Sequence, residues 1–305
     1  MNDAHPADTA PPPGFETFGP TAGFSTQVGP FYARQGDDGD LVYGFPTAKR
    51  HRNLNGVVHG GALYTFADQV LGHAVVSGLQ RMCATIKLKV EYLAPVHPGR
   101  WVEGRCDIVG HDDDMAFVRA RITTGSHLLM TADGCFRLLG PWQRPAAGTP
   151  VVRPSPTPAP APPVADTALP EGFKAFRIQS PFVRAYAPTF YRRDPDGTYV
   201  CGMQCNAGFD NSNGIVHGGA LFAFADEAIG RAGSAASRRY SATITLDASY
   251  LAAAPLDAWL EGRARVVRQT NTLSFLRTEV SSGDRLLLTA DAILRLFDRY
   301  DRPAA

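Results

Sequence analysis

One glycine-rich stretch occurs twice in this chain, and the repetition constrains the fold more than any other feature. NGVVHGG at residues 55–61 returns as NGIVHGG at residues 213–219, a displacement of 158 positions in a chain of 305 residues. The same displacement relates Trp101 to Trp259. Because the register is kept almost without gaps, the sequence predicts two copies of one backbone. About 150 residues is also an ordinary size for one domain.

A proline-rich segment separates the two copies. Residues 140–169 contain too much proline for a helix or a central strand, so they predict an extended, semi-rigid linker. The predicted domains on either side span residues 12–139 and 170–298. Since such a linker can reach across a domain, the two copies can pair as the subunits of a dimer would.

Hydrophobic patterning within each copy predicts an α+β fold, with one long helix against an antiparallel sheet of about five strands. Residues 60–78 are apolar almost all round and bounded by glycines, which is typical of a helix covered by protein on most sides. Four strand-like runs follow the helix and one precedes it. In the first run after the helix, Ile86, Leu88 and Val90 alternate with polar residues, so we expect these three side chains to face the core.

The charge, the apolar runs and the cysteines of the chain argue against several classes of binding partner. With 30 basic and 29 acidic residues the formal charge is +1, which gives no general field that would attract nucleic acid or an anionic membrane. The start of the chain lacks signal-peptide features and no run has the roughly 18 apolar residues of a membrane span, so we expect a soluble cytoplasmic protein. The five cysteines do not recur in register and match no paired metal spacing, so we expect free thiols and no metal site.

The residues that recur identically at the helix entry are the candidates for chemistry. Adjacent glycines at a helix start leave unpaired N–H groups at the positive end of the helix dipole, where an oxyanion can be stabilised; a plain helix entry is the alternative. An aspartate inside an apolar helix is costly unless it is paired or protonated, which favours a functional role over a structural one. The histidines could orient a carbonyl, donate a proton or only close the turn, and the asparagines could hold the lytic water or orient the substrate. The set comprises Asn53, His59, Gly60, Gly61 and Asp68, with Asn211, His217, Gly218, Gly219 and Asp226.

Helix geometry separates these residues within one copy. Gly61 and Asp68 are seven residues apart, about 10 Å along a helix, so one carbonyl carbon cannot contact both. Antiparallel packing of the two helices would bring the aspartate of each copy opposite the glycines of the other. The spacing therefore predicts two composite sites, one with Asp226 facing Gly61 and the other with Asp68 facing Gly219. Glu227, which follows Asp226, is expected to be solvated.

The pattern N-x-x-G-x-x-H-G-G, followed by six residues and an aspartate, resembles the hotdog-fold acyl-coenzyme A (CoA) thioesterases of the phenylacetate-degradation type, here in tandem. The similarity continues into the strand ATIKLKVEYLAPVHPG. It implies hydrolysis of acyl-CoA without a cofactor, with the N–H of the second glycine polarising the thioester carbonyl and the facing aspartate acting as general base or nucleophile. It also implies that Thr85 and Thr243 help to bind the water or the aspartate.

The resemblance carries further expectations about the substrate. Arg81, Arg239 and Arg268 could contact phosphates, although ordinary surface arginines are the alternative for each. The basic run at residues 49–52 and the acidic run at residues 112–114 have no counterparts in the other copy, so the two sites are expected to differ. We expect helix aromatic residues to line the acyl pocket, namely Tyr64, Phe66, Phe222 and Phe224.

Two alternatives to hydrolysis stay open at this stage. Hotdog folds also serve as acyl-CoA binding modules without turnover, although an aspartate in both copies argues against that role. A hotdog enoyl-CoA hydratase would need an aspartate and a histidine at a different spacing, which the sequence lacks. The family further implies that two whole chains form a homodimer.

Overall fold

The computed structural model describes residues 10–20, 22–142, 169–185, 188–211 and 213–297, and most of the expected linker lies outside these ranges. The elements of the first half are β1 (Glu16–Thr17), α1 (Phe24–Val28), β2 (Tyr32–Gln35), β3 (Leu41–Pro46), the 3-10 helix η1 (Lys49–His51), α2 (Gly60–Leu79), β4 (Arg81–Tyr92), β5 (Trp101–His111), β6 (Met115–Thr124) and β7 (His127–Pro141). Those of the second half are β8 (Lys174–Ala175), α3 (Pro181–Arg184), β9 (Thr189–Arg193), β10 (Tyr199–Gln204), the 3-10 helix η2 (Ala207–Phe209), α4 (Gly218–Ser237), β11 (Ser241–Tyr250), β12 (Trp259–Gln269), β13 (Leu273–Ser282) and β14 (Arg285–Leu296).

The described strands form one continuous antiparallel sheet. Its order is β1-β2-β3-β5-β6-β7-β4-β11-β14-β13-β12-β10-β9-β8, which is nearly a mirror image about its centre. At that centre β4 pairs with β11, and this pairing joins the two halves edge to edge. Five long strands in each half match the expected number, and the short β1, β2, β8 and β9 extend the two outer edges. The α+β fold with two tandem hotdog units is therefore confirmed.

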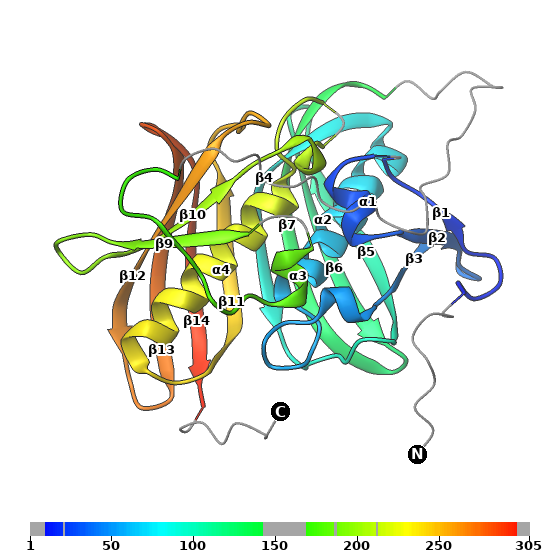
Figure 1. Ribbon diagram of the computed structural model, residues 1–305. Helices are drawn as coiled ribbons and strands as arrows, with labels where there is room; N and C mark the ends of the chain where they lie inside the picture. Colours follow the sequence, from blue (N-terminus) through cyan, green and yellow to red (C-terminus); the bar gives the residue numbers. More distant parts are fainter. Residues whose placement is uncertain (1–9, 21, 143–168, 186–187, 212, 298–305) are drawn as a thin grey trace, which may run out of the picture.

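The two long helices pack against each other inside the curve of the sheet (Figure 1). A Cβ atom placed on Gly61 would lie 2.7 Å from Cβ of Ala223, and one on Gly219 would lie 2.8 Å from Oγ1 of Thr65. Residue numbers rise along one helix as they fall along the other, so α2 and α4 are antiparallel. Glycine is needed at position 61 because an added Cβ would also lie 3.1 Å from the Cα atom of Ala223, so the two backbones approach too closely for a side chain. No helix in the described part of the chain is long and apolar enough to cross a membrane.

A β-bulge changes which side chains of β4 face inward. The pairing with β7 shifts register between Thr85 and Lys87, and β11 has the same shift between Thr243 and Thr245. Leu88 is fully buried as expected, but Ile86 is 37% exposed, so the expectation that Ile86 faces the core is wrong. The extra residue of a bulge breaks strict alternation, and here it turns Thr85 toward α2.

Candidate active site

Antiparallel packing brings the entry of each long helix next to the aspartate of the other half. In the first site, Asp226 Oδ2 lies 3.9 Å from Nδ1 of His59. In the second site, Asp68 Oδ2 lies 4.0 Å from Nδ1 of His217. Each aspartate is only 8% exposed. The first site therefore takes its helix entry from the first half and its carboxylate from the second, and the second site is the reverse.

Each histidine caps the helix that follows it. His59 is the N-cap residue of α2, and its Nδ1 accepts a hydrogen bond of 3.0 Å from the N–H of Gly61. His217 accepts the equivalent bond of 2.9 Å from Gly219 at the start of α4. Nδ1 is therefore the unprotonated ring nitrogen, an assignment that follows from the hydrogen-bond network. The histidines thus close the turn before the helix, which was one of the roles left open by the sequence.

In the first site the first glycine of the pair, rather than the second, faces the carboxylate. A Cβ atom on Gly60 would lie 3.2 Å from Oδ2 of Asp226, and no described residue accepts a hydrogen bond from the Gly60 N–H. The Gly60 carbonyl accepts a bond of 2.9 Å from the Tyr92 hydroxyl. Because the Gly61 N–H already donates to its histidine, this geometry does not support the expected role of the second glycine. The unpaired donor beside the carboxylate belongs to Gly60.

A threonine from the bulged strand of the same half holds each aspartate. Thr85 donates a hydrogen bond of 3.0 Å to Oδ1 of Asp68, and Thr243 donates one of 2.8 Å to Oδ1 of Asp226. Burial raises the pKa of Asp68 to about 6, while the Thr85 hydrogen bond opposes the shift. Burial likewise raises the pKa of Asp226, against the effects of His59 and Thr243. A carboxylate whose pKa lies near neutrality is suited to accept a proton from water.

The two sites differ at the residue that follows the aspartate. Glu227 Oε2 lies 3.8 Å from Nε2 of His59, and its other oxygen accepts a bond of 2.7 Å from Arg231. Its side chain is only 12% exposed, so the expectation that Glu227 is solvated is wrong. Burial alone would raise the pKa of Glu227, but the neighbouring His59 ring and the charge of Arg231 hold it below its usual value. The first site therefore contains a second negative charge.

A neutral amide takes the place of that charge in the second site. The side-chain nitrogen of Gln69 lies 2.8 Å from Nε2 of His217, and Ser25 Oγ lies 2.9 Å from the same atom. Since this ring nitrogen carries the hydrogen, the amide of Gln69 must be turned so that its oxygen accepts. Burial lowers the pKa of His217 to about 4, so the ring is neutral at physiological pH.

The predicted asparagines shape the loop that leads into each helix. The side-chain oxygen of Asn53 accepts bonds of 2.9 Å from the N–H of Asn55 and 3.2 Å from that of Val57. The oxygen of Asn211 accepts one of 2.9 Å from the N–H of Asn213. These contacts are typical of Asx turns. Within the described residues, neither side chain hydrogen-bonds to the aspartate or the histidine of a site.

Two of the three candidate phosphate-binding arginines donate hydrogen bonds to backbone carbonyls at the ends of strands. Arg81 donates to the carbonyl oxygens of Leu139 and Asp113, at 2.6 and 3.5 Å. Arg239 makes the corresponding contacts with Phe297 and Asn271, both at 2.6 Å. These bonds hold strand ends and hairpin loops together, which is the structural alternative for both. Arg268 is exposed, at the irregularity between Val266 and Arg268 of β12.

The helix aromatics fill the core instead of lining a pocket. Tyr64 and Phe222 stack across the seam with ring centroids 3.2 Å apart, which leaves no space for an acyl chain between them. Phe66 packs against Phe31 and Phe45. Phe224 is 1% exposed and belongs to the same core. The expectation that these rings line an acyl pocket is therefore wrong for this conformation.

Comparison with known proteins identifies the family. The model of the thioesterase superfamily matches residues 55–131 and again residues 213–289, together half of the chain. The chain therefore belongs to the thioesterase superfamily, and hydrolysis of thioesters is the general activity that this membership supports. Among the residues that the structure describes, no group of three or more His, Cys, Asp or Glu side chains could hold a metal ion.

Individual relatives agree with this assignment. A Pseudomonas aeruginosa protein with the name "putative esterase" is 30% identical over 129 residues, which covers 42% of this chain and 96% of that protein. A hotdog-fold protein of unknown function from Alicyclobacillus acidocaldarius superposes with a TM-score of 0.63 at 18% identity, over 91% of this chain and 98% of its own. An acyl-CoA thioesterase II from Mycobacterium marinum gives a TM-score of 0.55 at 12% identity, over 90% and 98%. At these identities the two structures show the fold alone.

Proposed function

We propose that this chain hydrolyses acyl-CoA thioesters at two composite sites, in a tandem form of the phenylacetate-degradation type. One observation carries the proposal: a buried aspartate, whose pKa is raised by burial, lies beside a glycine whose N–H has no partner among the described residues, at the start of a long helix. In the first site these groups are Asp226 and Gly60. A base and an oxyanion donor side by side are the groups that hydrolysis of a thioester requires.

The chemistry follows from the positions of these groups. The N–H of Gly60 binds the thioester oxygen and stabilises the negative charge that develops there, helped by the dipole of α2. The carboxylate of Asp226, oriented by Thr243, either removes a proton from the attacking water or attacks the carbonyl itself. The departing thiolate has a parent pKa of about 8.5, so it leaves without strong protonation. Gly218 and Asp68 do the same in the second site.

A panel of substrates tests the proposal directly. Release of free thiol is measured with acyl-CoA thioesters of varied chain length and aromaticity, and acid release is measured with oxygen esters of the same acyl groups. We expect turnover of thioesters well above that of the oxygen esters, because an alkoxide is a much more basic leaving group than a thiolate and departs less readily without protonation. Binding of acyl-CoA without thiol release would overturn the proposal in favour of a binding module. Hydration of an enoyl-CoA without thiol release would point instead to a hydratase.

The hydroxyl of Thr85 should control the pH dependence of the second site. Its hydrogen bond stabilises the ionised form of Asp68, so Thr85→Ala should raise the pKa of Asp68 above about 6. Because the ionised carboxylate is the active form, kcat increases as the pH rises through the pKa of Asp68. In Thr85→Ala this increase should occur at a higher pH than in the parent. The measurement is kcat against pH in an Asp226→Asn background, which isolates the second site. Thr85→Ser keeps the hydroxyl and should restore the parent profile; an unchanged profile in Thr85→Ala would contradict the assignment.

A further inference from the structure

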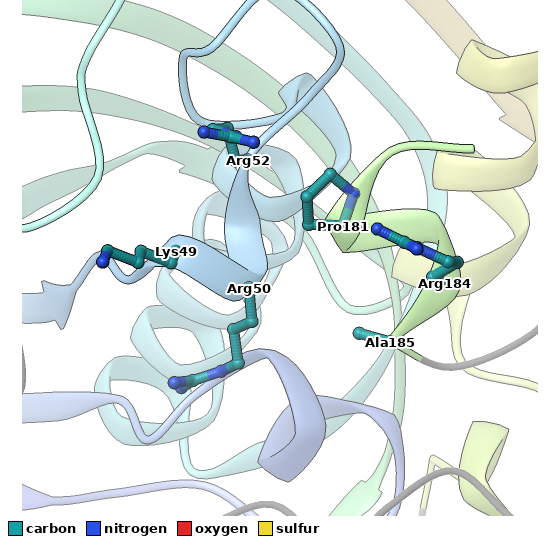
Figure 2. Close-up of a pocket in the computed structure, with 6 residues that line it drawn as sticks. All are labelled: Lys49, Arg50, Arg52, Pro181, Arg184 and Ala185. Atoms are coloured by element: carbon teal, nitrogen blue, oxygen red, sulfur yellow. The ribbon is translucent and has the colours of Figure 1, made fainter. Parts of the chain in front are cut away.

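A pocket lined by four basic residues opens where the two halves meet. Its volume is about 470 Å³, and Figure 2 shows the segment around η1 on one side of it and α3 on the other. The lining residues are Lys49, Arg50 and Arg52 from the first half, with Pro181, Arg184 and Ala185 from the second. None of the ion pairs found among the described residues involves one of these four basic side chains. His51, the remaining residue of the basic run at 49–52, is buried and neutral, because burial lowers its pKa to about 3.

Arg50 lines the pocket on the side of the first half. Its guanidinium donates to the carbonyl oxygen of Gly29, while its Nε is buried and has no hydrogen-bond partner among the described residues. A buried donor without a partner is costly, and an anion in the pocket would add negative potential close to it. Lys49, Arg52 and Arg184 are exposed, so their charges are available to a ligand.

This pocket adjoins the first site. The N–H of Phe182 in α3 donates a bond of 3.2 Å to the carbonyl of Arg52, which anchors the two walls to each other. The ring of Phe182 stacks on His59, with centroids 4.7 Å apart. A single aromatic residue between Pro181 and Val183 therefore separates the basic pocket from the histidine that caps α2.

The equivalent position next to the second site has none of these charges. In the repeat, the counterparts of the basic residues 49, 50 and 52 are Ala207, Gly208 and Asp210, and the counterpart of Arg184 is Thr26. Gln27 donates a bond of 2.8 Å to the Gly208 carbonyl, and a Cβ atom on Gly208 would lie 2.2 Å from the Gln27 amide nitrogen. This corner is therefore filled by a neutral side chain, and the one charged residue in it is acidic. The contrast lies between two halves of one protein with the same backbone, so the fold itself does not require the basic residues.

We propose that the basic pocket formed by η1 and α3 binds the phosphate groups of the CoA portion of the substrate, and that it serves the first site alone. This inference rests on the proposed hydrolysis of acyl-CoA. The nucleotide end of CoA carries on the order of four negative charges, since its diphosphate and 3′-phosphate contribute about two each. Four cations from two halves of the chain match that charge. A phosphopantetheine attached to a carrier protein offers a single phosphate, which four cations exceed.

The kinetic test compares substrates with and without phosphates at one site. In an Asp68→Asn background, which leaves the first site active, kcat/KM is measured for an acyl-CoA and for the N-acetylcysteamine thioester of the same acyl group. We expect Lys49→Ala/Arg184→Ala to lower the ratio of the two values at least about tenfold, mainly through KM, and high salt to reduce the difference. The matched control is Thr26→Ala, the counterpart of Arg184, which should leave the ratio unchanged.

A binding measurement makes the test independent of turnover. Calorimetric titration of the full-length protein with adenosine 3′,5′-bisphosphate should give one site per chain, with affinity at least about tenfold lower in Lys49→Ala/Arg184→Ala. If no thioester is hydrolysed but the bisphosphate binds in this way, the proposed hydrolysis fails and the phosphate site stands. If acyl-CoA is hydrolysed and both the ratio and the bisphosphate affinity are unaffected, the phosphate site is wrong. The phosphate site would also be wrong if Lys49→Ala/Arg184→Ala lowered the hydrolysis of acyl groups attached to a carrier protein but not the hydrolysis of acyl-CoA.

Discussion

Replacing both aspartates with asparagine should abolish hydrolysis of acyl-CoA, with kcat at least about 100-fold below the parent. Asparagine keeps the size of the side chain and can still accept the hydrogen bonds from Thr85 and Thr243, but it neither removes a proton from water nor attacks a carbonyl. General-base catalysis typically contributes a factor of 10² to 10⁴. Thiol release by Asp68→Asn/Asp226→Asn against saturating acyl-CoA is the measurement.

The single variants separate the contributions of the two sites, and a matched control tests whether the loss is specific to these two aspartates. Asp133 and Asp291 also recur in register, but they are paired with exposed arginines of β6 and β13, so Asp133→Asn should retain full activity. If the two sites were equal and independent, each single variant would keep about half the activity. Because the basic pocket serves the first site, we expect Asp226→Asn to lose the larger share at low acyl-CoA concentration. Full activity in the double variant, with the fold intact by circular dichroism, would refute the assignment of both sites.

The fold could be predicted from the sequence because its signals are long and repeated. The apolar run predicts a helix over residues 60–78, and α2 spans Gly60–Leu79. The antiparallel contact between the helices follows from the spacing of Gly61 and Asp68. Both signals are periodic, and periodicity survives local irregularities. The bulge in β4 is a single extra residue, which leaves no periodic mark. For that reason the alternating pattern predicts the wrong face for Ile86.

Details of the site depend on contacts that spacing alone does not reveal. Adjacent glycines indicate a helix entry, yet the choice between Gly60 and Gly61 depends on which N–H the histidine ring reaches. Glu227 looks like a solvated residue beside Asp226, because nothing local shows that Arg231 and His59 enclose it. One signal was available in the sequence: Arg231 is four residues after Glu227, the spacing of an ion pair on one helix face. Such a pair allows a carboxylate to be buried next to a histidine.

The basic run at residues 49–52 shows the value of comparing the halves with each other. In the sequence it is a departure from the repeat without an explanation, since its counterpart is neutral apart from Asp210. The structure adds Arg184 from the other half, which no local pattern could bring to the same place. Because the two halves share a backbone, a residue in one half can be compared directly with the residue at the equivalent position of the other half. Differences at the seam therefore point to function more directly than differences on the outer strands.

The close approach of the two long helices leads to the second large expected effect. Gly61→Ala should lower the free energy of unfolding by about 1 to 3 kcal/mol, because the added Cβ would lie 2.7 Å from Cβ of Ala223 and 3.1 Å from its Cα. Backbone cannot rotate away as a side-chain tip can, so α2 and α4 must move apart. Since each site draws residues from both helices, separation should also reduce thiol release at both sites. Denaturant unfolding and hydrolysis of acyl-CoA are the two measurements.

Two other glycines of the same helices separate crowding from the general effect of adding a methyl group. At Gly72 an added Cβ would meet only the ring of Phe136 at 3.8 Å, an ordinary contact, so Gly72→Ala should leave stability unchanged or raise it by up to about 1 kcal/mol through helix propensity. At Gly219 the obstacle is Thr65, whose hydroxyl bonds to the Gly61 carbonyl but can turn, so Gly219→Ala should cost less than Gly61→Ala. Equal stability of Gly61→Ala and Gly72→Ala would show that the helices are not in contact at this point. The composite sites would then lose their geometric basis, because the distance between Asp226 and His59 depends on that contact.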